Sequence, residues 1–248
     1  GYEVELICPP EARIFQESIR FGVRATACPI ARKNLTGWWH LRHALSERSI
    51  DVLNTHSSTD SWLAALACAT LANAPPIVRT RHISAPLTAN PATRWLYGSA
   101  TRHVVTTGER LRGQMLREAG LDGSRVTSVP TGIDVARFVP GNRASARRDT
   151  GLPQEKLLVG IVATLRSWKG HRYLIDAIAK LDRKDIQLVI VADGPQRHAL
   201  QNQASRIPDP TRISFVGDQA NVVPWLQSLD IFVLPSYANE GVPQAIMQ

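Results

Sequence analysis

Short apolar runs alternate along the chain with longer segments in which apolar residues recur with helical spacing. The short runs are rich in β-branched residues and predict strands at residues 4–8, 51–54, 76–80, 103–106, 125–129, 157–162, 186–191, 212–216 and 231–234. The longer segments predict helices over 59–71, 108–119, 171–181 and 195–206, each with one buried face. Strands that alternate with helices predict parallel sheets of the doubly wound α/β class.

The length of the chain predicts two hydrophobic cores. At 248 residues it is too long for one typical single-core domain and comfortable for two. Residues 131–153 are rich in Gly, Pro and Arg and interrupt the alternation of strands and helices. We therefore expect a first Rossmann-like domain over 1–138, a linker over 139–153 and a second domain over 154–248, with a cleft between the two domains.

Composition is that of an ordinary soluble protein, with 44% hydrophobic and 20% charged residues. No apolar run reaches the ~18 residues that suggest a membrane-spanning helix. The three cysteines, Cys8, Cys28 and Cys68, have no CxxC spacing, which favours reduced thiols in a cytoplasmic protein over a metal site.

Positive charge is concentrated in the first part of the chain. Residues 1–150 hold 19 lysines and arginines against 12 acidic residues, whereas residues 151–248 hold 10 against 9. No aromatic residues are interleaved with this charge to stack nucleotide bases, so nucleic acid is not expected as a partner. The asymmetry fits a peripheral contact with an anionic membrane surface or an anionic acceptor; a merely solvated surface explains it equally well.

Four loops at the carboxyl ends of predicted strands carry the candidate chemistry, because ligands of open α/β sheets bind there. Arg166 and Lys169 precede a helix whose first turn starts near Gly170, an arrangement suited to a diphosphate. Gly194 allows a tight turn after the next strand, and the amides that follow Gly217 could contact a nucleotide base. The last loop places the carboxylate of Glu240 directly before Gly241, at the start of another helix.

The order and spacing of these loops resemble the C-terminal half of retaining glycosyltransferases of family 4 (group 1), which have the GT-B architecture. The matching segments are VPTGIDVARF (129–138), VATLRSWKGH (162–171), DGP (193–195), FVGDQANVVPWL (215–226), DIFVLPS (230–236) and NEGVPQA (239–245). A looser similarity to the acceptor domain of the family is carried by DVLNTHSSTDSWLAALA (51–67) and RTRHIS (79–84).

The resemblance implies a donor site for a UDP-, GDP- or ADP-sugar, with no cofactor and no metal. It places the donor diphosphate at Arg166, Lys169, Gly241 and Val242, the donor sugar and ribose at Glu240, Gln244 and Gln248, and the nucleotide base near Gly194, Gly217, Asn221 and Val222. Cationic side chains and a helix N-terminus would take the leaving-group charge that a divalent ion carries in other glycosyltransferases.

Two positions depart from the pattern of the family. Its arginine usually lies five residues before the lysine, where this chain has Thr164, and Arg166 lies two residues further on. The second glutamate of the Glu-x7-Glu pattern falls on Gln248, which can still accept a hydrogen bond from a ribose hydroxyl but carries no charge. We expect an altered nucleotide preference more than a lost activity.

Histidines supply the candidates in the first half. By resemblance His56 lies near the donor sugar and acceptor and is assigned to catalysis together with Glu240 and Lys169, while His82 is an acceptor-side candidate. A structural hydrogen bond is the alternative for His56. The remaining histidines are expected on surfaces or at strand starts: His40, His43, His103, His171 and His198.

The expected reaction is glycosyl transfer with retention to an envelope polysaccharide or lipopolysaccharide acceptor, in the cytoplasm or at the inner face of the membrane. An acceptor hydroxyl would attack the anomeric carbon on the face from which the nucleoside diphosphate departs, which needs positioning and charge stabilisation instead of two glycosidase carboxylates. A non-catalytic nucleotide-sugar-binding module and a sugar-nucleotide epimerase are the alternatives. By resemblance, the chain is also expected to lack the first strand-helix unit and the C-terminal helices of the family.

Overall fold

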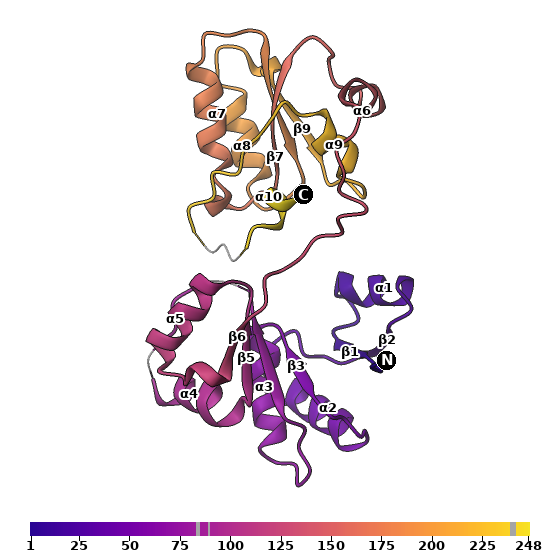
Figure 1. Ribbon diagram of the computed structural model, residues 1–248, viewed down its shortest axis with the longest axis vertical. Helices are drawn as coiled ribbons and strands as arrows, with labels where there is room; N and C mark the ends of the chain where they lie inside the picture. The colour runs from indigo at the N-terminus through magenta and orange to yellow at the C-terminus, as the bar shows by residue number, and fades with distance from the viewer. Residues whose placement is uncertain (83–84, 89, 239–241) are drawn as a thin grey trace. The chain divides into compact units, whose positions relative to one another are not determined.

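The computed structural model describes residues 1–82, 85–88, 90–238 and 242–248, which divide into two compact α/β units, Gly1–Pro130 and Thr131–Gln248 (Figure 1). The division falls after Pro130, earlier than the predicted end of the first domain at residue 138. The predicted cleft between the two units stays a prediction.

The first unit consists of two parallel sheets and the helices between their strands. One sheet pairs β1 with β2, and the other has the order β3-β4-β5-β6. The strands are β1 (Glu5–Cys8), β2 (Arg24–Ala27), β3 (Leu53–Thr55), β4 (Ile77–Arg81), β5 (His103–Thr106) and β6 (Val126–Ser128). The helices are α1 (Arg13–Arg20), α2 (Leu35–Ser46), α3 (Ser58–Cys68), α4 (Pro91–Arg94), the π-helical η1 (Trp95–Ala100), α5 (Glu109–Ala119) and the 3-10 turn η2 (Gly123–Arg125).

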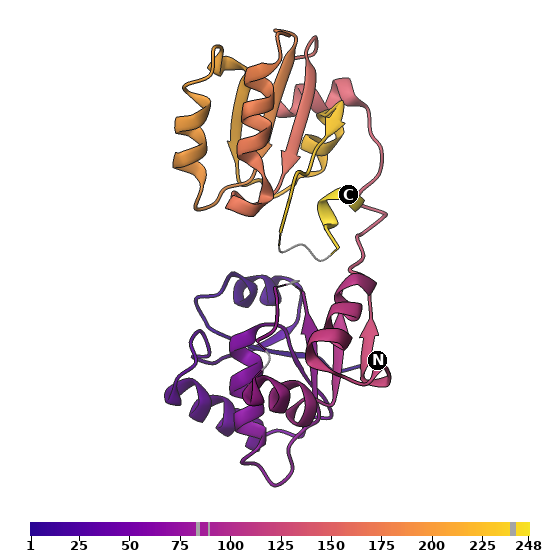
Figure 2. The ribbon, with the colours of Figure 1, turned by 90° about the vertical axis from the view of Figure 1, so that its left-hand side faces the viewer.

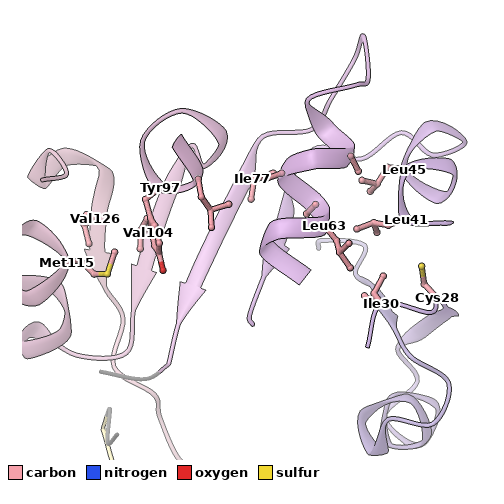
Figure 3. Packing of buried hydrophobic residues seen from close by; sticks show 14 residues of the cluster. Cys28, Ile30, Leu41, Leu45, Leu63, Ile77, Tyr97, Val104, Met115 and Val126 are labelled. Carbon is pink, nitrogen blue, oxygen red and sulfur yellow. The ribbon is translucent and has the colours of Figure 1, made fainter. Parts of the chain in front are cut away.

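One hydrophobic core joins both sheets of the first unit. Figure 3 shows this core running from Cys28 and Ile30 past Leu63 to Met115 and Val126, which are all nearly inaccessible to solvent. Burying side chains of this size stabilises the unit by about 1.5–3 kcal/mol each relative to leaving them exposed. The short strands of the unit are therefore held by a common apolar interior in addition to their backbone hydrogen bonds.

The second unit is a four-stranded parallel sheet in the order β10-β7-β8-β9. Its strands are β7 (Leu157–Val162), β8 (Ile186–Val191), β9 (Ile213–Gly217) and β10 (Ile231–Phe232). Its helices are α6 (Arg143–Thr150), the 3-10 turn η3 (Ser167–Lys169), α7 (His171–Lys180), α8 (Arg197–Ala204), the 3-10 turn η4 (Pro210–Arg212), α9 (Val223–Ser228) and α10 (Gln244–Met247).

Strand β8 lies at the centre of the second unit and is buried along its whole length. Side chains of a strand alternate between the two faces of the sheet. Leu188 and Ile190 pack into the core beneath α7 and α8, whereas Val189 and Val191 join the smaller core on the opposite face. Figure 1 shows α7 and α8 on one side of the sheet and α6 and α9 on the other, and Figure 2 shows the same sheet from a second direction. Helices on both faces of a parallel sheet confirm the predicted doubly wound fold class.

The predicted linker is wrong over residues 143–150, because this segment forms α6, which packs against α9 in the second unit. Asn142 begins the helix by accepting a hydrogen bond from the N–H of Ser145, and Gly151 ends it in the left-handed conformation. Its buried face consists of only Ala146 and Arg147, so the sequence shows no apolar stripe by which the helix could be recognised.

A buried ion pair anchors α6 to the sheet. Arg147 is only 5% exposed, pairs with the carboxylate of Asp230 and donates to the carbonyls of Ser228 (3.0 Å) and Gln154 (2.7 Å). Asp230 lies directly before β10 and also accepts from the N–H of Leu158, at 2.7 Å, and from Arg143, at 2.7 Å. The pair therefore ties one helix to two neighbouring strands.

Within the described ranges, each helix is too short or too polar to span a bilayer. The three cysteines are free; Cys8 and Cys28 are buried and Cys68 is half-buried.

We predict that Arg147→Ala lowers the free energy of unfolding by about 1.5–3 kcal/mol, because the Asp230 carboxylate loses its buried charged partner and keeps only Arg143 and the N–H of Leu158. Arg148→Ala on the exposed side of the same helix is the matched control and should change it by no more than about 0.5 kcal/mol. Urea unfolding followed by circular dichroism measures both. Equal stability of the two variants would contradict the anchoring role of Arg147.

Candidate functional site

The loops that follow β7, β8 and β10 are in direct contact at the carboxyl edge of the second sheet. Leu165 joins the first two loops, since its N–H donates to the carbonyl of Asp193 (3.0 Å) and its carbonyl accepts from the N–H of Gln196 (3.0 Å). The N–H of Tyr237 in the loop after β10 donates to the carbonyl of Trp168 at 3.1 Å. The loops after β7, β8 and β10, which were predicted to carry the chemistry, are therefore packed together.

Two glycines permit this close packing. Gly170 has a left-handed backbone with φ 79°, and a Cβ atom there would lie 2.3 Å from the carbonyl oxygen of Pro235. A Cβ on Gly194 would lie 2.8 Å from the backbone nitrogen and oxygen of Leu165. The structure thus gives Gly194 a packing role, and its predicted proximity to the nucleotide base stays a prediction.

Two hydrogen bonds join the loop after β8 to the loop after β9, and the backbone is strained where they form. Ala192 has φ 118°, which is unusual for a residue with a side chain, and its N–H donates to the carbonyl of Gly217 at 2.9 Å. The N–H of Asp193 donates to the carboxylate of Asp218 at 3.0 Å, and Asp193 forms an ion pair with Arg197 at 2.8 Å. Backbone strain costs on the order of 1–3 kcal/mol and tends to be kept at functional sites.

Two cations lie at the start of α7. Arg166 is exposed and its guanidinium carbon lies 5.8 Å from the centre of the Trp168 ring, and Lys169 is half-buried in η3. Gly170 precedes the first residue of α7, so no side chain caps the N–H groups of the first turn. Uncapped N–H groups beside cationic side chains can bind the oxygens of a phosphate.

His171 is the residue of this edge that sequence reasoning missed, because we expected it on a surface. Its side chain is 1% exposed, and its Nε2 atom lies 3.2 Å from the carbonyl oxygen of Ala163. Burial lowers the pKa of His171 to about 4, so the ring is neutral at pH 7 and its Nε2–H donates to that carbonyl. The sequence could have indicated this burial, because His171 lies three and four residues before Leu174 and Ile175 on the apolar face of α7.

The remaining predicted donor-site residues have varied surroundings. Glu240 and Gly241 lie outside the described residues, and Val242 is half-buried. Gln244 begins α10 and donates to the carbonyl of Gly132 at 3.1 Å, while the N–H of Gln248 donates to the carbonyl of Gln244. Asn221 accepts from Arg137 (3.3 Å) and from the N–H of Val223 (3.2 Å), next to the half-buried Val222.

In the first unit the structure brings His56 and His82 together at the carboxyl ends of β3 and β4. The Nδ1 atom of His56 lies 3.0 Å from Nε2 of His82, and the rings are stacked with centres 5.3 Å apart. Because one nitrogen must donate and the other accept, the pair holds one proton between its rings. Desolvation and the neighbouring His82 lower the pKa of His56, and Asp60 opposes them.

A capping box sets the position of His56. The hydroxyl of Ser57 accepts from the N–H groups of Thr59 and Asp60 at the start of α3. The carboxylate of Asp60 in turn accepts from the N–H groups of Ser57 (2.8 Å) and His56 (3.0 Å). The backbone that carries His56 is thus fixed by the first turn of the helix that follows it.

Solved structures share this fold. HepE of Anabaena, crystallised with UDP and glucose, superposes with a TM-score of 0.79 at 16% identity over 98% of this chain and 69% of its own. Sucrose-phosphate synthase of Thermosynechococcus elongatus gives 0.77 at 16% identity over 98% and 68%. The structure therefore has the GT-B fold with two Rossmann-like units, as the resemblance to the family predicted.

Family models identify the chain further. The model of glycosyltransferase family 4 matches residues 1–137, and that of glycosyl transferases group 1 matches residues 156–248. The chain belongs to glycosyltransferase family 4. It is 29% identical over 164 residues to the D-inositol 3-phosphate glycosyltransferase of Nocardia farcinica, covering 62% of this chain and 36% of that protein. The enzyme of the same name from Stackebrandtia nassauensis is 26% identical over 218 residues, covering 75% and 48%. The chain thus spans between about a third and a half of the length of these curated relatives.

We predict that the stability of the second unit is sensitive to acid through His171. The folded-state pKa of about 4 lies below the ordinary value of 6.5, so the unfolded chain binds the proton first as the pH falls. The stabilisation present above pH 6.5 is therefore lost between pH 6.5 and 4, by about 3 kcal/mol. Denaturant unfolding at several pH values should show this loss in the wild type and in the exposed control His198→Gln, and a smaller loss in His171→Gln. Parallel pH profiles of all three proteins would refute this.

We also predict that His82→Ala raises the pKa of His56. Removing the second ring removes its electrostatic contribution and part of the desolvation, both of which lower that pKa. An NMR titration of the His56 ring proton measures the change, with His40→Ala as a control that leaves the pair intact. An unchanged His56 titration in His82→Ala would mean that the two rings do not interact in solution.

Proposed function

We propose that this protein is a retaining glycosyltransferase that moves a sugar from a nucleoside diphosphate sugar to a hydroxyl group without a metal ion. The observation that carries the proposal is the joined loop edge of the second unit, where Arg166, Lys169 and the uncapped start of α7 lie together in a chain of glycosyltransferase family 4. In such a site the charge that develops on the departing diphosphate is stabilised by cations and peptide dipoles already in place.

The donor roles follow the same arrangement. Arg166, Lys169, Gly241 and Val242 bind the diphosphate, Glu240 and Gln244 bind the sugar, and Gln248 accepts from the ribose. Gly194, Gly217, Asn221 and Val222 form the surroundings of the base. Solved relatives of this fold include complexes with UDP and with UDP-glucose, which supports a nucleotide-sugar donor and makes UDP-glucose the first candidate to test.

The reaction needs no pair of carboxylates. The acceptor hydroxyl attacks the anomeric carbon on the face from which the diphosphate leaves; the new glycosidic bond forms as the bond to the diphosphate oxygen breaks, and that oxygen takes the proton of the hydroxyl. We assign His56 to the donor sugar and His82 to the acceptor side. The pKa of His56 is lowered by desolvation, so its neutral ring can hydrogen-bond a hydroxyl group without adding charge.

The acceptor is a glycan or glycolipid of the bacterial envelope, and the protein works in the cytoplasm at the inner face of the membrane. The basic first part of the chain supports a contact with anionic lipid or with an anionic acceptor. A non-catalytic nucleotide-sugar-binding protein is the second candidate, favoured by Thr164 and Gln248 where the family has charged residues.

We predict that Lys169→Ala in the full-length protein lowers the rate of glycosyl transfer by a factor of about 10²–10³, because it removes one stabilising charge from the leaving group. Release of UDP from UDP-glucose with and without a glycan acceptor measures the rate, and thermal unfolding shows whether the fold is intact.

The matched control is Lys184→Ala, which removes an exposed lysine before β8, at the opposite edge of the same sheet. It should leave the rate unchanged. Wild-type turnover of Lys169→Ala would contradict the assigned donor site, whereas binding of nucleotide sugars without any turnover by the wild type would favour the non-catalytic alternative.

A further inference from the structure

Two arginines are buried on the same face of β4. Arg79 is 6% exposed and Arg81 is 8% exposed, and together with the buried Ile77 they alternate with half-buried positions along the strand. Arginine is rarely buried unless an anion compensates its charge, because desolvating an unpaired ion is costly. The partners of these two side chains therefore need to be identified.

Arg79 has an aromatic neighbour and no anionic partner. Its guanidinium carbon lies 4.4 Å from the centre of the Tyr97 ring, in η1. With the residues that the structure describes, the side chain of Arg79 forms no hydrogen bond and no ion pair, and its Nη1 atom is buried without a partner. Burial lowers the pKa of Arg79, and the positive charge of Arg81 lowers it further, against the opposing effects of Tyr97 and Asp60.

Arg81 is bound to neutral groups only. One Nη atom donates to the hydroxyl of Tyr97 at 2.8 Å, and the other donates to the carbonyl of Ala85. Its Nε atom is buried and has no partner among the described residues. Tyr97 thus lies against both guanidinium groups, which share one aromatic ring and no carboxylate.

The carboxylates whose charge acts on these arginines are already engaged elsewhere. Asp60, which acts on Arg79, accepts from the N–H groups of His56 and Ser57 at the start of α3. Glu118, on which Arg81 acts, accepts from the N–H of Leu87 (3.0 Å) and from Gln114 (3.0 Å). In the described part of the chain, neither carboxylate forms an ion pair with Arg79 or Arg81.

Further unpartnered polar atoms lie at the same edge of the sheet. The hydroxyl of Thr107, directly after β5, and the hydroxyl of Ser128, the last residue of β6, are both buried without a hydrogen-bond partner among the described residues. Arg81 is in register with Thr106, and Thr106 with Ser128, so these donors belong to neighbouring strand ends. Buried donors without acceptors at a carboxyl edge indicate a bound group that supplies oxygen atoms.

We propose that Arg79 and Arg81, held by Tyr97, form a binding site for a phosphate group of the acceptor substrate. Two guanidinium groups can donate several parallel N–H bonds to the oxygens of a phosphate, which suits its shape and charge better than a single ammonium would. The site lies at the strand ends that carry His56 and His82, where the proposed function places the acceptor. The claim that the phosphate belongs to the acceptor rests on that proposed function. The claim that the site binds phosphate is independent of it.

The test measures the binding of inorganic phosphate to the full-length protein by calorimetry and by the shift in melting temperature. We expect the wild type to bind phosphate, and Arg79→Met to bind it at least tenfold more weakly while the unliganded variant melts at the wild-type temperature or above it. Replacing a buried charge that has no partner by an apolar side chain of similar length removes a desolvation cost. Arg102→Met, an exposed arginine at the opposite end of the neighbouring strand β5, should bind phosphate like the wild type.

Three results would overturn the proposal. Wild-type phosphate affinity in Arg79→Met would exclude the arginine from the site. A large loss of melting temperature in unliganded Arg79→Met, with no binding of phosphate by the wild type, would mean that Arg79 only supports the packing of Tyr97. Tighter binding of malonate, a dicarboxylate, than of phosphate would replace the phosphate by a carboxylate. Arg81→Gln is measured in the same way and replaces Arg79→Met if that variant does not fold.

A separate measurement tests the phosphate site and the proposed function independently of each other. The residues assigned to the donor diphosphate belong to the second unit, so Arg79→Met should leave the Kd for UDP-glucose, measured without acceptor, unchanged. With a phosphorylated polyol as acceptor, the same variant should raise the KM for the acceptor at least tenfold and leave the KM for UDP-glucose unchanged. Absence of UDP release in the wild type would remove the proposed function and leave the phosphate titration to decide the site.

Discussion

Burial of the parallel sheet on both faces is the constraint on which the second unit depends. Along β8 every side chain is covered, with Leu188 and Ile190 on one face and Val189 and Val191 on the other. A strand in this position cannot present polar chemistry along its length without desolvating it. Gln187, near the start of β8, is buried and donates to the hydroxyl of Ser214 on β9 at 2.7 Å. The polar and charged groups of the candidate site lie instead at the carboxyl ends of the strands, where loops bring them together. The contact of Leu165 with Asp193 and Gln196, and the close approach of Gly170 to Pro235, turn three separate loops into one surface.

The strands that are buried in the sheets were also the elements that the sequence predicted best. The strands at 103–106, 157–162 and 186–191 were predicted with the bounds that the structure has. Short, largely apolar runs between turn residues are typical of buried strands in a parallel sheet. The segment 231–234 was predicted as a strand, but only Ile231–Phe232 pairs with β7, since the chain then turns into the loop that meets Trp168. Helix α6 was missed because its buried face is an alanine and an arginine, a pattern without hydrophobic period.

The sequence predicted at which strand ends the candidate residues lie, but it did not predict the surroundings of their side chains. The rule that ligands bind at the carboxyl ends of parallel strands placed Lys169 and Gly194 in loops after strands, and the structure has them in the loops after β7 and β8. It could not reveal that Gly194 is needed for contact with Leu165, or that His171 is buried, since both depend on loops from distant parts of the sequence. The sequence likewise does not show that Arg79 and Arg81 are buried, because residue type alone does not tell whether a charged side chain reaches water.

A comparison of two buried arginines, one in each unit, shows that the partner of the guanidinium group determines whether its burial stabilises the fold. Arg147 and Arg79 are almost equally buried, at 5% and 6% exposure. The charge of Arg147 is compensated by Asp230 and by two backbone carbonyls, so its burial serves the fold. Arg79 faces an aromatic ring and a second arginine, which compensate its charge only in part. A fold gains nothing from such an arrangement, whereas a binding site does, because a ligand oxygen that replaces the missing carboxylate recovers the desolvation cost at the moment of binding.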